Sequence, residues 1–207
     1  FPLGLPMLSA IQHIVFPEVP LSKHVRTAVS SNFLNVPLFG PLLRWLGCFA
    51  AEKEQLHAML RDTWVILLPD GIAGTYHTNS SDMGAEHVYL SKRQGFIRTA
   101  LEEGSTLVPC FWFGHSQLWT IWPSHDSAIA RFSRRIRWSI LWFWPIVPRP
   151  GRLTLVVGRG IPVEKVSNPT AEQIQALHSQ FTQSLSALYY EYRMVAGVHP
   201  TRPLLIV

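Results

Sequence analysis

Residues 89–115 read YLSKRQGFIRTALEEGSTLVPCFWFGH, and this stretch decides the expected fold class. Apolar side chains recur at helical spacing over residues 92–103, with Ser91 placed to cap the helix and Gly104 placed to end it. The following residues, 106–113, are mostly apolar, β-branched or aromatic, which predicts a strand. A helix followed closely by a strand indicates an α/β layer with short connections.

The rest of the chain extends this alternation of helices and strands. Further strands are predicted at residues 64–68 and 153–157, and further helices at residues 50–61 and from Thr170 to near Gly197. Thr170 and Gln173 have the spacing of a capping box. No low-complexity linker and no internal repeat interrupts the chain. The sequence therefore predicts one α/β domain over residues 1–207, with a mixed sheet flanked by helices.

The composition excludes several classes of protein. Only 15% of the 207 residues are charged, against roughly 25% in soluble domains, whereas 12% are aromatic and 8 are Trp. This chain has enough apolar surface to fold, so it is not disordered, and it has neither collagen nor coiled-coil repeats. The net charge of +5 suits anionic headgroups, phosphorylated substrates or nucleic acid. No motif supports nucleic-acid binding, so no nucleic-acid partner is expected.

An uncharged aromatic run occupies residues 138–148. As a helix it would cover about 16 Å, roughly half of a ~30 Å hydrocarbon core, so it cannot span a membrane. Indole rings beside guanidinium groups suit the headgroup boundary, which predicts contact with a membrane surface. A core segment with a solvated basic flank is the alternative. The residues concerned are Trp138, Trp142 and Trp144, with Arg131, Arg134, Arg135 and Arg137 before the run and Arg149 and Arg152 after it.

A second apolar segment, residues 33–49, fits either a protein core or the wall of an acyl-chain tunnel. The ends of two predicted strands carry polar residues. Asp70 and Gly71 follow the first strand at a sheet edge, where α/β folds usually bind ligands. His115 follows the strand that ends at residue 113. These three residues are candidates to line a site.

Two cations, Lys92 and Arg93, precede Gly95 at the predicted start of a helix. Backbone N–H groups at a helix start favour anions, so a phosphate-bearing substrate is a candidate ligand there. An ordinary surface ion pair is the alternative for Arg93. The sequence has no paired-ligand spacing for a metal, no Gly-x-Ser-x-Gly, no Walker A loop and no Gly-x-Gly-x-x-Gly turn. No metal is expected.

Several motifs, in order, resemble the type-2 diacylglycerol acyltransferase family, most closely its plant-like members. The resemblance is carried by VILLPDGIAGTYH at residues 65–77, YLSKRQGFIRTA at 89–100, GSTLVP at 104–109, FGH at 113–115, VVGRGIPV at 156–163 and NPT at 168–170. It covers practically the whole chain and implies an acyltransferase-like α/β fold.

The chain departs from the family pattern at three places. The family's His-Pro-His-Gly motif, Glu-Pro-His-Ser in plants, is followed by a segment that Phe1-Pro2-Leu3-Gly4 resembles. The resemblance therefore implies that the catalytic His lies upstream of Phe1, together with a membrane anchor, and that the chain contains no catalytic residue. Asp70 stands where the family has the first Gly of a pair, and Gly74 stands where it has Glu. His115 stands where it has Glu or Gln.

The resemblance implies an acyl-CoA-dependent O-acyltransferase that converts diacylglycerol to triacylglycerol. No cofactor is implied, since acyl-CoA is a co-substrate. Lys92, Arg93 and Gly95 would hold CoA phosphates or the developing anion. The residues implied to contact substrate are Arg93, Lys92, Gly95, Phe96, Asp70, Gly71, His77 and His115.

Other readings stay open at this point. The acceptor could instead be monoacylglycerol, a fatty alcohol or a sterol, and a non-catalytic, membrane-associated lipid-binding scaffold is the alternative of another class. The implied location is the cytosolic face of the endoplasmic reticulum membrane, with the lipid droplet as the alternative. This chain by itself is expected to be inactive, and a homo-oligomer is left open.

Overall fold

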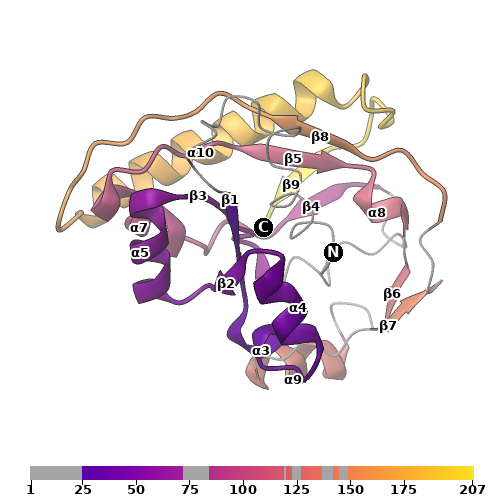
Figure 1. The fold of residues 1–207 in the computed structure, drawn as a ribbon. Coiled ribbons are helices and arrows are strands. Elements are labelled where there is room, and N and C mark those ends of the chain that lie inside the picture. Colours follow the sequence, from indigo (N-terminus) through magenta and orange to yellow (C-terminus); the bar gives the residue numbers. More distant parts are fainter. Residues whose placement is uncertain (1–24, 72–83, 119, 123–126, 137–141, 145–148) are drawn as a thin grey trace. The chain divides into compact units, whose positions relative to one another are not determined.

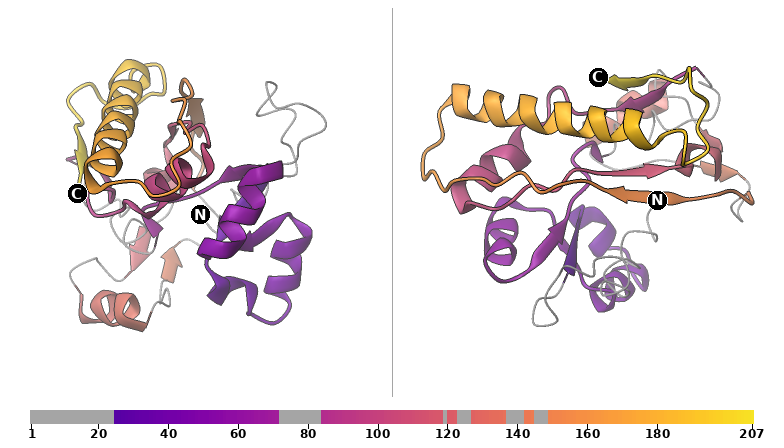
Figure 2. Two further views of the ribbon diagram at one scale, coloured as in Figure 1. Left: turned by 90° about the vertical axis from the view of Figure 1, so that its left-hand side faces the viewer. Right: turned by 90° about the horizontal axis from the view of Figure 1, so that it is seen from above.

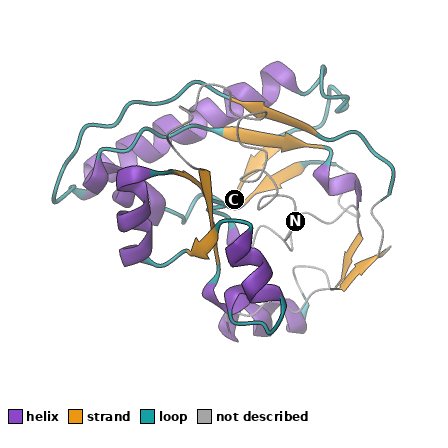
Figure 3. Ribbon diagram, viewed as in Figure 1, coloured by secondary structure: helices purple, strands orange, loops and turns teal. Residues whose placement is uncertain are grey.

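The computed structural model describes residues 25–71, 84–118, 120–122, 127–136, 142–144 and 149–207 (Figure 1). The chain divides into two compact units, residues 1–68 and 69–207. Helices and short strands alternate in both, which confirms the predicted mixed α/β class (Figure 3). Among the described residues, no helix combines the length and the apolar character that a membrane crossing requires. The prediction that both units belong to a single domain stays a prediction.

The first unit contains a three-stranded parallel sheet. The strands lie in the order β2 (Cys48–Ala50), β1 (Val25–Val29) and β3 (Trp64–Ile66). Parallel neighbours need crossover connections. Here these connections contain the helices α3 (Ser31–Leu34), α4 (Phe39–Trp45) and α5 (Lys53–Asp62). The helix predicted at residues 50–61 begins at Lys53, because Ala50 is hydrogen-bonded into the sheet as the last residue of β2.

The apolar segment 33–49 contributes to the core of this first unit. Leu34, Leu43 and Cys48 are buried together there, which supports the core alternative for that part of the segment. In contrast, Leu38 is 90% exposed and Trp45 is 81% exposed. Some residues of the segment are therefore buried in the core and others are exposed to solvent.

The second unit is organised around one long helix, α10 (Ala171–Tyr192), which runs alongside two strand pairs (Figure 2). Strand β5 (Cys110–Phe113) pairs antiparallel with β8 (Thr154–Val157), and β4 (Glu86–Val88) pairs parallel with β9 (Leu204–Ile206). The helix contacts β5, β9 and α7 (Gly95–Glu103). Its buried face consists of Ile174, Leu177, His178, Phe181, Leu185, Leu188 and Tyr189.

Helix α7 begins later than its sequence pattern predicts. Ser91 does not cap it, because the helix begins only at Gly95. Residues 91–92 form a turn, and the Ser91 backbone N–H donates to the carbonyl of Val207 at 3.0 Å. Gln94 occupies the N-cap position instead, without a side-chain capping bond. The predicted end at Gly104 is confirmed: this residue has φ 66° and closes the helix in the left-handed conformation.

The strand predicted at residues 106–113 is also shorter in the structure. Pro109, which has no N–H to donate, directly precedes β5 at Cys110. Leu107 is joined to Ile161 by two backbone hydrogen bonds of 3.0 and 2.7 Å, so it forms a separate bridge. Regular pairing with β8 therefore covers only the last four residues of the predicted strand.

The aromatic run 138–148 is described only at β7 (Trp142–Trp144). This strand pairs antiparallel with β6 (Thr120–Trp122). The short helix α8 (His115–Leu118) precedes β6, and α9 (Ala128–Ile136) lies between β6 and β7 in the chain. Trp138 lies outside the described residues.

The capping box at the start of α10 predicts a measurable contribution to stability. The Thr170 hydroxyl accepts from the Gln173 backbone N–H at 3.3 Å, and the Gln173 side chain accepts from the Thr170 N–H at 2.9 Å. Thr170→Ala is expected to lower the free energy of unfolding by about 1 kcal/mol in urea denaturation. Thr170→Ser keeps the hydroxyl and serves as the control. Equal stability of the Ala and Ser variants would contradict this role.

The close approach of Gly114 to the chain before β8 gives a second prediction. Gly114 has φ 84°, and a Cβ built there would lie 2.1 Å from the Arg152 carbonyl oxygen. Gly114→Ala is therefore expected to cost more than the roughly 1–2 kcal/mol of the left-handed conformation alone. Gly84→Ala, whose Cβ meets no atom within 4 Å, is the control and should change the melting temperature little. Similar melting temperatures for both variants would refute the predicted clash.

Candidate active site

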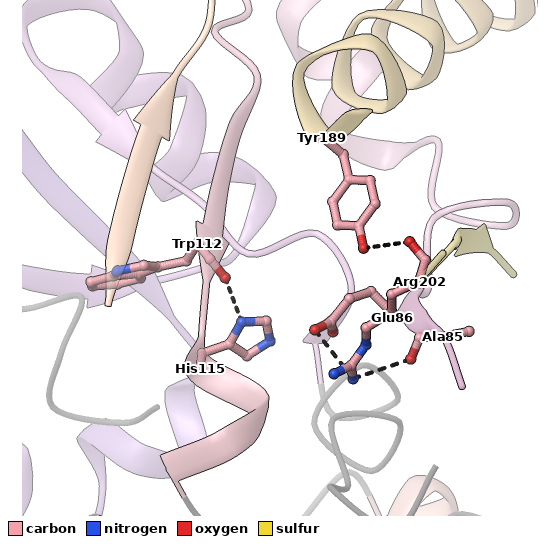
Figure 4. Close-up of polar contacts among 6 residues, drawn as sticks. All are labelled: Ala85, Glu86, Trp112, His115, Tyr189 and Arg202. Atoms are coloured by element: carbon pink, nitrogen blue, oxygen red, sulfur yellow. Dashed lines mark hydrogen bonds and ion pairs between the residues drawn. The ribbon is translucent and has the colours of Figure 1, made fainter. Parts of the chain in front are cut away.

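His115 stands at the end of β5 and is held in one orientation (Figure 4). Its Nδ1 lies 2.5 Å from the carbonyl oxygen of Trp112. A carbonyl can only accept a hydrogen bond, so Nδ1 carries a proton, and in the neutral ring Nε2 therefore keeps its lone pair. The half-buried ring also meets Phe111 edge-on, with 6.5 Å between ring centroids. His115 is thus in the tautomer whose Nε2 can accept a proton or a hydroxyl hydrogen bond.

Asp70 is the electrostatic neighbour of His115. Burial raises the pKa of the Asp70 carboxyl above its usual range. The imidazole of His115 and backbone N–H groups at Asp70 and Gly71 partly lower that pKa again. Gly71 has φ 55° and is exposed in the turn that follows Asp70. The charge of the His115 imidazole acts on the Asp70 carboxyl, which indicates that these two residues lie near each other, and Gly71 directly follows Asp70. That they form one site stays a prediction.

Lys92, Arg93 and Gly95 form a separate, exposed cluster at the start of α7. The Arg93 guanidinium carbon lies 5.5 Å from the centre of the Tyr89 ring, a cation–π contact. The N-cap residue Gln94 makes no side-chain capping bond to the first turn of α7, whose leading backbone N–H groups have no partner within the helix. Cations beside the leading N–H groups of a helix are chemically suited to phosphate.

Phe96 does not join that surface. Its ring packs edge-on against Phe181 of α10, with 5.2 Å between centroids, and belongs to the margin of the core. The residue thus has a structural role next to the two cations. A contact between Phe96 and substrate remains only an expectation from the sequence.

The two polar clusters lie far apart along α10. The Gln94 side chain, next to Arg93, donates to Gln175 at 2.8 Å. At the other end, the Tyr189 ring contacts the strand that leads to His115. At 1.5 Å per residue, the helix positions of Gln175 and Tyr189 are roughly 20 Å apart. The structure therefore does not bring Lys92 and Arg93 to His115.

A buried polar network supports the strand that leads to His115 (Figure 4). Arg202 pairs with Glu86 at 3.3 Å, and their side chains are only 13% and 8% exposed. The Tyr189 hydroxyl donates to the Arg202 carbonyl at 3.0 Å, and the Tyr189 ring stacks on Phe113 at 5.5 Å. Burial, reinforced by Glu86, raises the pKa of Tyr189 to about 12, so the phenol stays protonated at neutral pH.

Sequence reasoning did not find this network. Glu86 and Arg202 are far apart in the chain, and no local pattern joins them. Near the end of α10, Tyr189 is fully buried whereas Tyr192 is 38% exposed. The one local signal in the sequence was a large aromatic residue, Tyr189, directly after the inward-facing Leu188. This signal could have suggested that Tyr189 is buried.

In the described parts of the chain, no further group of residues forms a candidate site. His77 and Gly74 lie outside the described residues. A His-x-x-x-x-Asp spacing that the sequence analysis did not find occurs at His57 and Asp62, but five residues along α5 place them about 140° apart around the helix. Among the described residues, no group of three or more His, Cys, Asp or Glu side chains could hold a metal. An open hollow of about 470 Å³ in the first unit contains none of the predicted site residues.

Comparison with known proteins gives one consistent family. A family model described as diacylglycerol acyltransferase matches residues 13–207. The chain is 28% identical to acyl-CoA wax alcohol acyltransferase 2 of Mus musculus, over 66% of this chain and 45% of that protein. It is 26% identical to diacylglycerol O-acyltransferase 2 of Danio rerio, over 93% and 56% of the respective chains.

A third relative, 2-acylglycerol O-acyltransferase 3 of Homo sapiens, is 27% identical over 83% of this chain and 55% of that protein. The chain thus spans about half the length of the curated relatives that it matches. No solved structure matches it. Because the family model covers nearly all of these residues, the chain belongs to the diacylglycerol acyltransferase family.

Proposed function

We propose that this chain is part of an acyl-CoA-dependent O-acyltransferase that converts diacylglycerol to triacylglycerol. The observation that carries the proposal is the family match over residues 13–207. In the reaction, the acceptor oxygen bonds to the acyl carbonyl carbon and its proton passes to a base. The thioester C–S bond then breaks, and the sulfur leaves with the proton as the CoA thiol.

His115 and Asp70 are proposed to position the acceptor hydroxyl in this reaction. An alcohol is a poor nucleophile at neutral pH and needs a hydrogen-bond acceptor aimed at its proton. Nε2 of His115 provides such an acceptor, because the Trp112 carbonyl fixes the proton on Nδ1. The Asp70 carboxyl lies near enough to stabilise positive charge on the ring. His77, the last residue of the motif at residues 65–77, remains a proposed lining residue.

The cluster of Lys92, Arg93 and Gly95 is proposed to bind the phosphates of CoA. Both cations are exposed, and Gly95 presents its backbone without a side chain at the start of α7. CoA carries its phosphates and its thioester at opposite ends of the pantetheine arm. The helix positions Gln175 and Tyr189, which contact the neighbours of the two clusters, are roughly 20 Å apart, and this spacing supports one extended acyl-CoA bound across the second unit.

Monoacylglycerol or a fatty alcohol is the second candidate acceptor. Relatives named for 2-acylglycerol and for wax alcohol match at 27% and 28% identity, as well as the relative named for diacylglycerol at 26%. A sterol is a further acceptor of the same chemical class. In all of these reactions a hydroxyl oxygen attacks the same thioester. The acceptor is therefore identified by comparing the rates of acylation of each alcohol in turn.

We also propose that the enzyme works at the cytosolic face of the endoplasmic reticulum membrane or on lipid droplets. Diacylglycerol is confined to lipid, whereas acyl-CoA carries charged phosphates that keep its head in water. An enzyme that joins the two substrates is best placed where lipid meets cytosol. Non-catalytic lipid binding is the competing function, and absence of product from the full-length protein would favour it.

Replacing Arg93 tests the phosphate-binding role. Arg93→Ala, in the full-length protein with labelled acyl-CoA, is expected to raise KM for acyl-CoA roughly 5- to 20-fold and to leave kcat nearly unchanged. The effect should shrink at high salt, because the exposed contact is screened. Arg98→Gln, on an exposed position of the same helix, is the matched control. An unchanged KM in Arg93→Ala would remove the proposed role.

Replacing His115 and Asp70 tests the positioning role. His115→Ala is expected to lower kcat/KM for the acceptor about 10²-fold, and His115→Gln, which keeps an acceptor atom, should recover part of the loss. The pH profile separates this role from a structural one. Since burial raises the pKa of Asp70, its protonation should reduce activity at a higher pH than for an ordinary carboxyl.

The variant Asp70→Asn should lose the part of the acid limb that Asp70 causes and have lower activity on the plateau. Exposed His199 provides the control His199→Ala, which should behave like the wild-type enzyme. Full activity of His115→Ala, or an acid limb in Asp70→Asn identical to that of the wild-type enzyme, would argue against the assignment.

A further inference from the structure

We propose that the β6–β7 ribbon and helix α9 each present side chains that bind a membrane containing anionic phospholipid headgroups. These side chains, called the membrane-binding surface below, are Trp122 and Trp144 on the strands and Ile129, Arg131, Phe132 and Arg135 on α9. This proposal goes beyond the acyl-transfer reaction, because lipid binding at this surface requires neither acyl-CoA nor an acceptor alcohol.

The two strands place exposed indole rings on one side of a ribbon. In the β6–β7 pair, Thr120 is opposite Trp144 and Trp122 is opposite Trp142. Directly opposed residues share a face, and so do residues two apart along one strand. Trp122 and Trp144 therefore lie on the same face, where they are 59% and 69% exposed. A ribbon face bearing large exposed indoles needs an apolar or interfacial partner.

Helix α9 adds both apolar and basic exposed side chains to the tryptophans of the ribbon. Its buried side is made by Ala130 and Ser133, both 0% exposed. Phe132, 55% exposed, and Ile129, 37% exposed, lie one turn apart on another side. Arg131 and Arg135, four residues apart, form an exposed basic edge beyond them. An apolar strip with an arginine edge is the pattern of a helix that lies in a membrane interface.

The helix is a formed element, so this exposure does not come from an irregular chain. Ser127 accepts the backbone N–H of Ala130 at 3.0 Å through its hydroxyl and so caps the first turn. The ribbon is also tied to the following segment, because Arg149 donates to the Thr120 hydroxyl at 2.9 Å. The exposed aromatic and basic groups are thus presented from regular secondary structure.

The charge of this region selects one kind of partner. Residues 127–163 contain seven of the 18 Lys and Arg residues and none of the 13 Asp and Glu residues. The rest of the chain therefore has more acidic than basic residues, and this one region accounts for the positive net charge of +5. Arginines attract anionic lipid and indoles enter the headgroup layer, so a bilayer containing anionic phospholipid satisfies both groups.

Vesicle sedimentation tests the surface directly. The 207-residue chain is mixed with phosphatidylcholine vesicles, with or without phosphatidylserine, in the absence of acyl-CoA. We expect tighter binding to the anionic vesicles, and we expect this preference to fall as salt is raised. Arg131→Gln combined with Arg135→Gln should weaken binding to anionic vesicles about 25-fold, since each arginine contributes about fivefold. The wild-type salt titration needs no mutation, so the test does not depend on the folding of a variant.

Matched substitutions distinguish binding by this surface from non-specific binding of the protein to vesicles. Trp122→Ala and Trp144→Ala should weaken binding to both vesicle types, whereas Trp45→Ala, at an exposed Trp of the first unit, should not. Arg98→Gln should likewise leave binding unchanged. Equal binding to both vesicle types would overturn the proposal, as would equal effects of surface and control variants. Sensitivity to the arginines but not to the tryptophans would indicate a general polyanion site and would also overturn it.

Because no acyl-CoA is present, failure of vesicle binding is independent of the proposed acyl transfer. The enzyme assay with detergent-solubilised acceptor tests the transfer reaction separately. An active enzyme whose chain does not bind vesicles would refute only the membrane surface. Vesicle binding without product would refute only the reaction.

Discussion

The second unit depends on the packing of one apolar helix face against short strands. The β5–β8 pair has four residues in each strand and the β4–β9 pair has three, and isolated two-stranded ribbons are marginal in water. Helix α10 covers them with seven buried side chains, including a fully buried Tyr189. Burial of that face, more than strand pairing, therefore accounts for the stability of the unit.

The same packing fixes the geometry of the candidate site. The Tyr189 ring lies against Phe111 and Phe113, with centroids 5.1 and 5.5 Å away, and the strand then turns at Gly114 into His115. The Tyr189 hydroxyl is held by the Arg202 carbonyl, while the Arg202 guanidinium pairs with Glu86. Breaking a buried pair leaves an uncompensated charge, so this network restricts where the end of β5 can lie.

Polar chemistry and membrane contact are divided among different elements of the second unit. The exposed cations at the start of α7 and His115 at the end of β5 lie at opposite ends of the α10 contact surface. The proposed lipid surface lies on β6, α9 and β7, in the region that carries the positive excess of the chain. The positive net charge of the chain thus comes from one region, in which arginines occur together with exposed aromatic residues.

The sequence by itself determined the α/β class, the capping box of α10, the stop at Gly104 and the family. Each of these depends on residues close together in the chain or on a motif that can be read directly. Tertiary structure alone decided the pairing of β4 with β9, the ion pair of Glu86 with Arg202 and the separation of Arg93 from His115. It also moved the start of α7, because Ser91 bonds to the C-terminal strand segment. Such contacts join residues about a hundred positions apart, and local periodicity carries no information about which distant partner a strand or a buried charge will meet.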